Sequence, residues 1–210
     1  MWRGWAVLGC LLAASSAWAS AANEFVEHDE SPTDHPVTVQ LQGGVAGYTG
    51  ALASRIDIGA TYGVSLAYDP SPFLGVEVGF TGAENELRLG PSGDDDPNPG
   101  APDLLRNGGY VIVTPGFSFQ LPSEKGTFFK PYALGGLGVD RYSPQGLTRT
   151  LGYAAQTVTN VPFGAGLKAR VGRFTADARV NYAWEFNERF SIFDDHPVRV
   201  QGQVLVGASF

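Results

Sequence analysis

The feature that most constrains this sequence is a strict alternation of apolar and polar residues that continues to its last residue. In the final stretch, VRVQGQVLVGASF (198–210), every valine occupies an even position, whereas the polar residues Arg199, Gln201 and Gln203 occupy odd positions. Successive side chains of a β-strand point to opposite faces of the sheet, so this period of two predicts a strand between two different environments. The stretch ends on an aromatic residue, Phe210, and not on a polar tail.

The same alternation recurs along the chain and predicts an all-β protein with eight strands. No helical periodicity is found after residue 36. Prolines within the pattern, at Pro115, Pro131 and Pro162, predict bulges or strand ends, because proline cannot donate a ladder hydrogen bond. The predicted strands are 37–47, 55–68, 73–82, 110–121, 127–140, 158–171, 173–186 and 198–210.

Longer and shorter connections alternate between the predicted strands. Tight ones, such as 69–72 and 172–173, alternate with longer ones, of which 83–107 is the longest. Transmembrane barrels have this arrangement, with short periplasmic turns and longer external loops. We therefore predict an eight-stranded antiparallel up-and-down transmembrane β-barrel. An even number of strands would place both termini in the periplasm.

The polar face of the predicted strands carries five acidic and five basic residues among small and amide side chains. A water-facing surface is usually about 25–35% charged, which this face is not. A narrow eight-stranded lumen, which side chains just fill, fits better. A soluble barrel with an apolar interior is the alternative. The ten charges are Asp57, Glu77, Asp140, Asp177 and Glu185 with Lys130, Lys168, Arg170, Arg179 and Arg199.

Buried charges must pair, so this face predicts a charge network that fills the lumen. An open pore is the alternative interpretation. The predicted network members are Glu77, Lys168, Arg170, Asp177, Arg179 and Glu185.

The residues before the first strand predict export and a polar tail. Arg3, an apolar run and Ala17-Trp18-Ala19 predict a signal peptide over residues 1–19, and Cys10 lies inside it. Residues 20–36 are acidic and aperiodic, which predicts a disordered tail ahead of a barrel over 37–210. The net charge of -7 argues against a nucleic-acid partner.

Four stretches together resemble the OmpA-like family of small outer-membrane β-barrels: GVSLAYDPSPFLGVEVGF (63–80), KPYALGGLGV (130–139), FGAGLKARV (163–171) and the terminal Phe210. The resemblance implies a location in the outer membrane of a Gram-negative bacterium, among its lipids. It also implies insertion by the barrel-assembly machinery, with Phe210 as the assembly signal. The C-terminal peptidoglycan-binding domain of OmpA has no counterpart, so cell-wall anchoring is not expected.

The sequence favours a monomeric barrel of structural or surface-interaction type over an enzyme, and it predicts no cofactor or metal. External loop 83–107 is the predicted contact surface for an extracellular partner. A small passive channel is one alternative. Another is a lipid A-modifying enzyme that uses Ser191 and His196 beside Asp194 and Asp195, although a solvated polar loop explains this stretch better. Weak binding of a divalent cation by the carboxylates of Asp94–Asn98 is a further alternative, although the run lacks the ligand spacing of a calcium loop.

Deletion of Phe210 tests its predicted role as the assembly signal. We expect the shortened chain to reach the outer membrane at a clearly lower level, because the last strand keeps its alternation but loses its terminal aromatic. Fractionation followed by gel migration with and without heating measures this level. A normal outer-membrane level would refute the assignment.

Overall fold

The computed structural model describes residues 36–50, 53, 56–86, 104–120, 127–145, 155–186 and 198–210, nearly all of them in antiparallel strands. The predicted signal peptide and almost all of the predicted tail lie outside these residues. Within the described ranges, no helix is long and apolar enough to cross a membrane.

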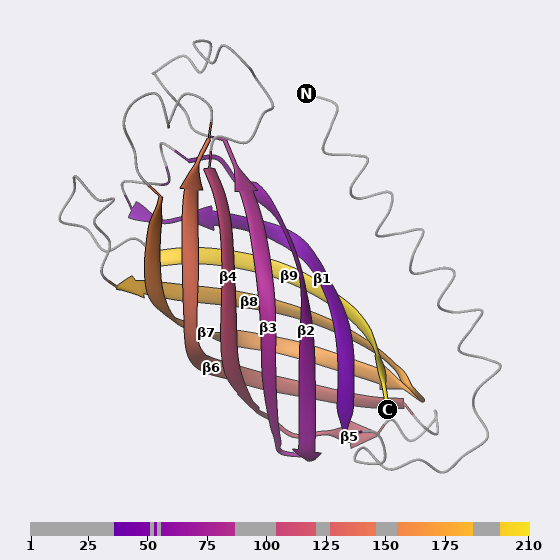
Figure 1. Cartoon of the computed structure of the whole chain (residues 1–210). Coiled ribbons are helices and arrows are strands. Elements are labelled where there is room, and N and C mark those ends of the chain that lie inside the picture. The colour runs from indigo at the N-terminus through magenta and orange to yellow at the C-terminus, as the bar shows by residue number, and fades with distance from the viewer. Residues whose placement is uncertain are drawn as a thin grey trace.

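Eight long strands close into one barrel, which confirms the predicted fold class (Figure 1). Their order around the wall is β4-β3-β2-β1-β9-β8-β7-β6, and pairing of β4 with β6 completes the circle. A ninth element, β5, is a two-residue strand beside β6. The strands are β1 (Val37–Tyr48), β2 (Gly59–Ser71), β3 (Leu74–Asn85), β4 (Leu104–Pro115), β5 (Phe119–Gln120), β6 (Thr127–Pro144), β7 (Gln156–Val171), β8 (Phe174–Phe186) and β9 (Val198–Ser209).

The first and last strands pair with each other along almost their whole length. The register runs from Thr38 opposite Ser209 to Tyr48 opposite Arg199. Beyond it, the backbone N–H of Phe210 donates to the carbonyl of Val37 at 2.8 Å. The chain therefore leaves no free edge at this seam, which a closed barrel requires.

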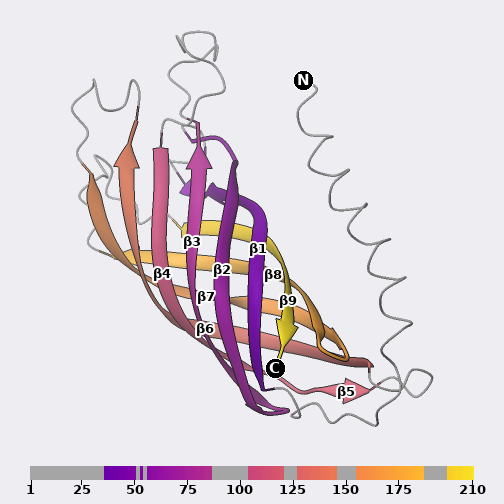
Figure 2. The same ribbon diagram turned by 45° about the vertical axis from the view of Figure 1, so that its right-hand side comes forward.

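The two ends of the barrel differ in their connections. At one end, here called the turn end, β2 and β3 are joined by Pro72-Phe73, and β7 and β8 by Gly172-Arg173. Gly172 has a φ of 55°, a left-handed conformation that tight hairpin turns favour. Phe210 and β5 lie at the turn end as well (Figures 1 and 2). The strand ends that flank the longer connections lie at the other end, the loop end.

The predicted external loop 83–107 was too wide. Residues 83–85 belong to β3 and residues 104–107 to β4. These strand ends were missed because Glu84 and Asn107 interrupt the apolar face of the two strands. Asn85 and Arg106 continue the polar face, and both side chains are buried in the lumen. Residues 87–103 lie outside the described part of the chain.

Two of the three strand prolines interrupt pairing as predicted, and one does not. β4 ends at Pro115, and the β6–β7 ladder has a gap that includes Pro162. Pro131 stays in continuous register opposite Leu167. It is tolerated because β4 pairs with β6 only as far as Gly135, which leaves Pro131 beyond that ladder.

Apolar side chains point out of the barrel and polar ones point in, so the soluble alternative with an apolar interior was wrong. Val64, for example, is 47% exposed, whereas its neighbour Ser65 is buried. Exposed aliphatic residues lie along every long strand. They include Val39, Leu41, Val45, Val64, Leu66, Val76, Val78, Val111, Val113, Val139, Leu167, Val180, Val204 and Val206.

The apolar outer belt has the height of a membrane core. Exposed aromatic residues lie near both ends of β8, with Phe174 at the turn end and Trp184 towards the loop end. Ten residue steps at about 3.4 Å, tilted by roughly 40°, give about 25 Å along the barrel axis, the height of the apolar band of transmembrane barrels. In the described ranges, the exposed charged residues lie at or near strand ends: Glu84, Glu86, Arg141 and Arg173.

An arginine placed in the belt tests whether this surface faces lipid. Val64→Arg lies midway along β2, and we expect it to lower the free energy of unfolding by about 2–4 kcal/mol. The matched variant Ile58→Arg lies just before β2 at the loop end and should cost about 0–1 kcal/mol. Urea unfolding in lipid vesicles measures both, and equal small losses would show a water-facing surface.

Candidate functional site

The lumen holds almost every charged side chain of the described strands and is the candidate functional site. The small interior of an eight-stranded barrel brings residues from opposite walls within hydrogen-bond distance. These side chains form three layers, taken here from the loop end to the turn end. The buried or half-buried charges are Asp69, Glu77, Arg106, Lys130, Asp140, Lys168, Arg170, Asp177, Arg179, Glu185 and Arg199.

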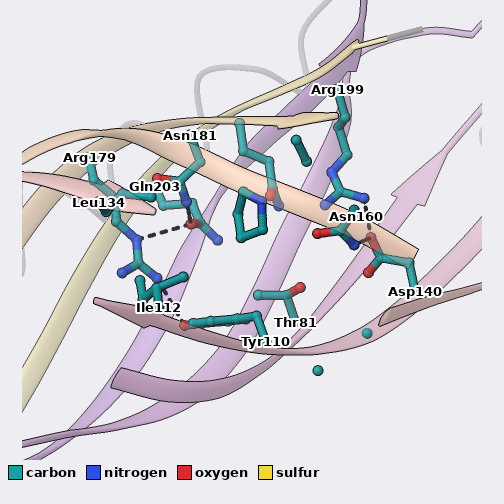
Figure 3. Close-up of a pocket in the computed structure, with 15 residues that line it drawn as sticks. Thr81, Tyr110, Ile112, Leu134, Asp140, Asn160, Arg179, Asn181, Arg199 and Gln203 are labelled. Carbon is teal, nitrogen blue, oxygen red and sulfur yellow. Dashed lines mark hydrogen bonds and ion pairs between the residues drawn. The ribbon is translucent and has the colours of Figure 1, made fainter. Parts of the chain in front are cut away.

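The first layer is a charge-balanced network towards the loop end. The Asp140 carboxylate accepts hydrogen bonds from Arg199 (Figure 3) and, at 2.8 Å, from Arg106. Arg199 also pairs with Glu185 at 2.9 Å. Asn160 donates to the second oxygen of Asp140 at 2.7 Å. Two carboxylates and two guanidinium groups thus neutralise one another.

An apolar cluster adjoins this network at the loop end. Tyr142 links the two, since its hydroxyl donates to Glu185 at 2.5 Å and accepts from Tyr48 at 3.3 Å. Ile56 is buried in this cluster ahead of the first residue of β2, whereas the next even residue, Ile58, is exposed. The cluster, here called the apolar cap, comprises Tyr48, Ile56, Leu104, Tyr142 and Val158.

The second layer is built around Arg179 of β8, on the wall opposite Glu77 of β3. Its Nη1 atom lies 2.9 and 3.1 Å from the two carboxylate oxygens of Glu77. Tyr110 donates to Glu77 at 2.6 Å and accepts from Arg179 at 2.9 Å. Gln42 and Gln203 accept the remaining Arg179 donors at 3.1 and 3.2 Å. The guanidinium is therefore fully satisfied although it is buried.

Asp177 lies next to this layer and is held by a tyrosine. The hydroxyl of Tyr132 lies 2.8 and 2.9 Å from its two oxygens. Tyr132 packs with Ile112 and Leu134, two apolar residues that face the lumen. Because β7 and β8 are in register here, Asp177 also lies opposite Lys168.

The third layer is at the turn end, where Asp69 reaches from β2 to the opposite wall. Its two carboxylate oxygens accept from Lys130 at 2.8 Å and from Lys168 at 2.9 Å. Arg170 lies on the ring of Phe128, with 5.4 Å between the guanidinium carbon and the ring centroid. Asp69 thus joins the β6 and β7 side of the barrel to β2 at this mouth.

The six predicted network residues all lie in the lumen: Glu185 in the first layer, Glu77 and Arg179 in the second, Asp177 next to the second, and Lys168 and Arg170 in the third. Phe210, the predicted assembly signal, is 64% exposed at the turn end. Asp57 precedes β2 and is only half-buried. Sequence reasoning missed Arg106 and Asp69, because one was assigned to a loop and the other to a tight turn. Continuing the alternation beyond the apolar residues would have found Arg106.

The residues of the enzyme alternative, Ser191, Asp194, Asp195 and His196, lie outside the described part of the chain, as does the run Asp94–Asn98. Among the residues that the structure describes, no group of three His, Cys, Asp or Glu side chains is arranged to hold a metal ion.

A closed barrel with an ion-paired polar lumen and an apolar outer belt defines the class of transmembrane β-barrels. No protein-family model and no curated protein matches the chain. It is similar to the N-terminal β-barrel domain of Pseudomonas aeruginosa OprF, with 16% identity and a TM-score of 0.50 over 82% of this chain and 97% of that one. Neisserial surface protein A (NspA) is similar at 18% identity and a TM-score of 0.54, over 83% and 97%. The shared feature is the fold.

A double-mutant cycle tests whether Glu77 and Arg179 depend on each other. Arg179→Met leaves a buried carboxylate without its cation, so we expect a loss of about 3–5 kcal/mol in the free energy of unfolding. Adding Glu77→Gln should restore part of this loss, with a coupling of about 0.5–3 kcal/mol. Urea unfolding in lipid vesicles measures the cycle, and the exposed Arg173→Met is the control for removing an arginine. Additive single losses would contradict the pairing.

Proposed function

We propose that this protein is a monomeric outer-membrane β-barrel of structural or surface-interaction type, whose lumen is not a passage for solutes. The apolar belt supports the membrane location, and the fold shared with the OprF domain and NspA agrees with it. The short turns lie at the same end as Phe210, which supports a periplasmic turn end and an external loop end.

The single observation that carries the proposal is the closure of the lumen near the loop end. The apolar cap and the charge-balanced first layer lie one behind the other, and both consist of buried side chains. Asp140 is held by two arginines and an asparagine from three other strands. An ion would have to separate these pairs and pass the tyrosines Tyr48 and Tyr142 as well.

Contact with other molecules is therefore assigned to the outer surfaces and not to the interior. The connection between β3 and β4, within the predicted contact loop, is the longest that the sequence offers. Nothing in the described strands favours the lipid A-modifying alternative, whose residues lie outside them.

Conductance in planar lipid bilayers tests the closed lumen. We expect the purified full chain to give no stable conductance steps, because the first layer and the apolar cap fill the section of the barrel near the loop end. The variant Tyr142→Ala/Arg199→Ala removes a tyrosine of the cap and the arginine that links both carboxylates, so it should conduct.

Heat-modifiable migration on gels shows whether the variant is folded, and Arg141→Ala, on the outer surface of the same strand as Tyr142, is the matched control. Stable steps from the unaltered protein would contradict the proposal in favour of a small passive channel.

A further inference from the structure

A small cavity lies between the first and second layers of the lumen. It encloses about 30 Å³, and its lining includes Asp140 and Arg199 of the first layer and Arg179 of the second (Figure 3). The lining residues are buried, apart from three that are exposed or half-buried: Gly109, Tyr110 and Asn181. The cavity therefore lies inside the barrel, on the turn-end side of the first layer.

The cavity exists because small residues occupy lumen-facing positions between the two layers. Alternate residues of a strand share a face, so Gly108 of β4 follows Arg106 of the first layer into the lumen. On β8, Ala183 precedes Glu185 of the first layer in the same way. A Cβ atom at Gly108 would collide with the carboxylate of Asp140, which crosses this position from β6. The two layers are thus separated by short side chains that do not fill the space.

Three buried polar atoms of the lining make no hydrogen bond within the described part of the chain. They are the Oδ1 atom of Asn181, the Nε atom of Arg199 and the Nε2 atom of Gln201. Asn181 and Gln201 lie directly opposite each other in the β8–β9 ladder, and Arg199 lies two residues from Gln201 on the same face of β9. Arg199 and Gln201 are only 4% and 5% exposed, so leaving these groups without a partner is costly.

The orientation of the Asn181 amide follows from its neighbours. The Oε1 atom of Gln203 accepts from the Nε atom of Arg179 at 3.2 Å, and an arginine nitrogen can only donate. The same oxygen accepts from the Nδ2 atom of Asn181 at 2.7 Å. Asn181 must therefore turn its amide nitrogen towards Gln203, and its oxygen remains as an acceptor beside the cavity.

We propose that this cavity binds a pair of water molecules that join the first layer to the second. A buried water needs about 10–15 Å³ of such space, so the 30 Å³ of the cavity has room for the pair. Each buried water makes about three hydrogen bonds, so two that bond to each other have about four left for the protein. The three unpartnered atoms and the carboxylate of Asp140 supply these bonds.

Water fits this lining better than an ion does. The unpartnered atoms comprise two donors and one acceptor, and water satisfies both kinds. The carboxylate of Asp140 and the amide oxygen of Asn181 oppose an anion, and the guanidinium groups of Arg179 and Arg199 oppose a cation. The inference rests on the closed lumen of the proposed function, because only an enclosed cavity retains the same water molecules.

Nuclear Overhauser effects (NOEs) between water and the methyl groups of the cavity test the proposal. The purified full chain, folded in detergent micelles with labelled methyl groups, is measured in water-selective experiments. We expect the methyl groups of Ile112, Leu134 and Ala183, which line the cavity, to show water NOEs of the sign that marks a long residence time. The methyl group of Ala67, which is equally buried but lies outside the lining, should show none.

The variant Asn181→Leu/Gln201→Met separates bound water from relay through hydroxyl protons. It replaces both unpartnered amides with apolar side chains of similar size, so the water NOEs should be lost. The hydroxyls of Tyr110 and Thr81, which also line the cavity, stay in place. The matched control is Gln40→Met, which removes a buried amide with an unpartnered nitrogen outside the lining and should keep the NOEs. Heat-modifiable migration on gels shows whether both variants are folded.

Two results would overturn the proposal. One is the absence of long-residence water NOEs at the cavity methyl groups of the unaltered protein, a result that requires no variant. The other is NOEs that persist in the folded double variant, because they would come from the hydroxyl protons. The conductance measurement tests closure separately, so a protein that neither conducts nor shows these NOEs would contradict the bound waters alone.

Discussion

Pairing between the first strand and the last is the interaction on which the rest of this structure depends. In lipid, an unpaired strand edge has no water to satisfy its N–H and C=O groups, so the sheet must close. Residues 38–48 of β1 supply that closure by pairing with residues 199–209 of β9. Closing eight strands also fixes the width of the barrel, and this width leaves an interior that side chains fill. The pairing of β1 with β9 thus determines how narrow the lumen is and how close its charged side chains lie to one another.

A narrow closed interior makes every charge inside it costly unless another wall supplies a partner. Arg179 and Glu77 lie on β8 and β3, and Asp69 reaches from β2 to lysines on β6 and β7. These pairs cross the lumen, whereas the ladder joins only neighbours. They tie together strands that are far apart in the sequence and around the wall. Removing one partner leaves the other buried and unpaired, and this is why such pairs are sensitive to single substitutions.

The sequence was enough to predict the number of long strands, which side chains point outward and how long and short connections alternate. This was possible because a lipid face and a polar lumen impose a period of two on every strand. The strand ends could not be predicted, because the polar residues near the loop end resemble a loop in sequence although some of them face the lumen, as Asn85 and Arg106 do. The ion-pair partners of the buried charges could not be predicted either. Nothing in the sequence near Asp69 indicates Lys168, which lies 99 residues away and meets it across the barrel. Pro131 was misjudged because its tolerance depends on where β4 stops.

The two mouths of the lumen differ in how their side chains are held together. At the loop end, two carboxylates and two arginines cancel, and the apolar cap adjoins them. At the turn end, Lys130 and Lys168 lie opposite each other and share the carboxylate of Asp69, and Lys168 also lies opposite Asp177. The turn end is thus held by ion pairs that cross the lumen, whereas the loop end combines ion pairs with an apolar cluster, and this difference agrees with a lumen that is closed near the loop end.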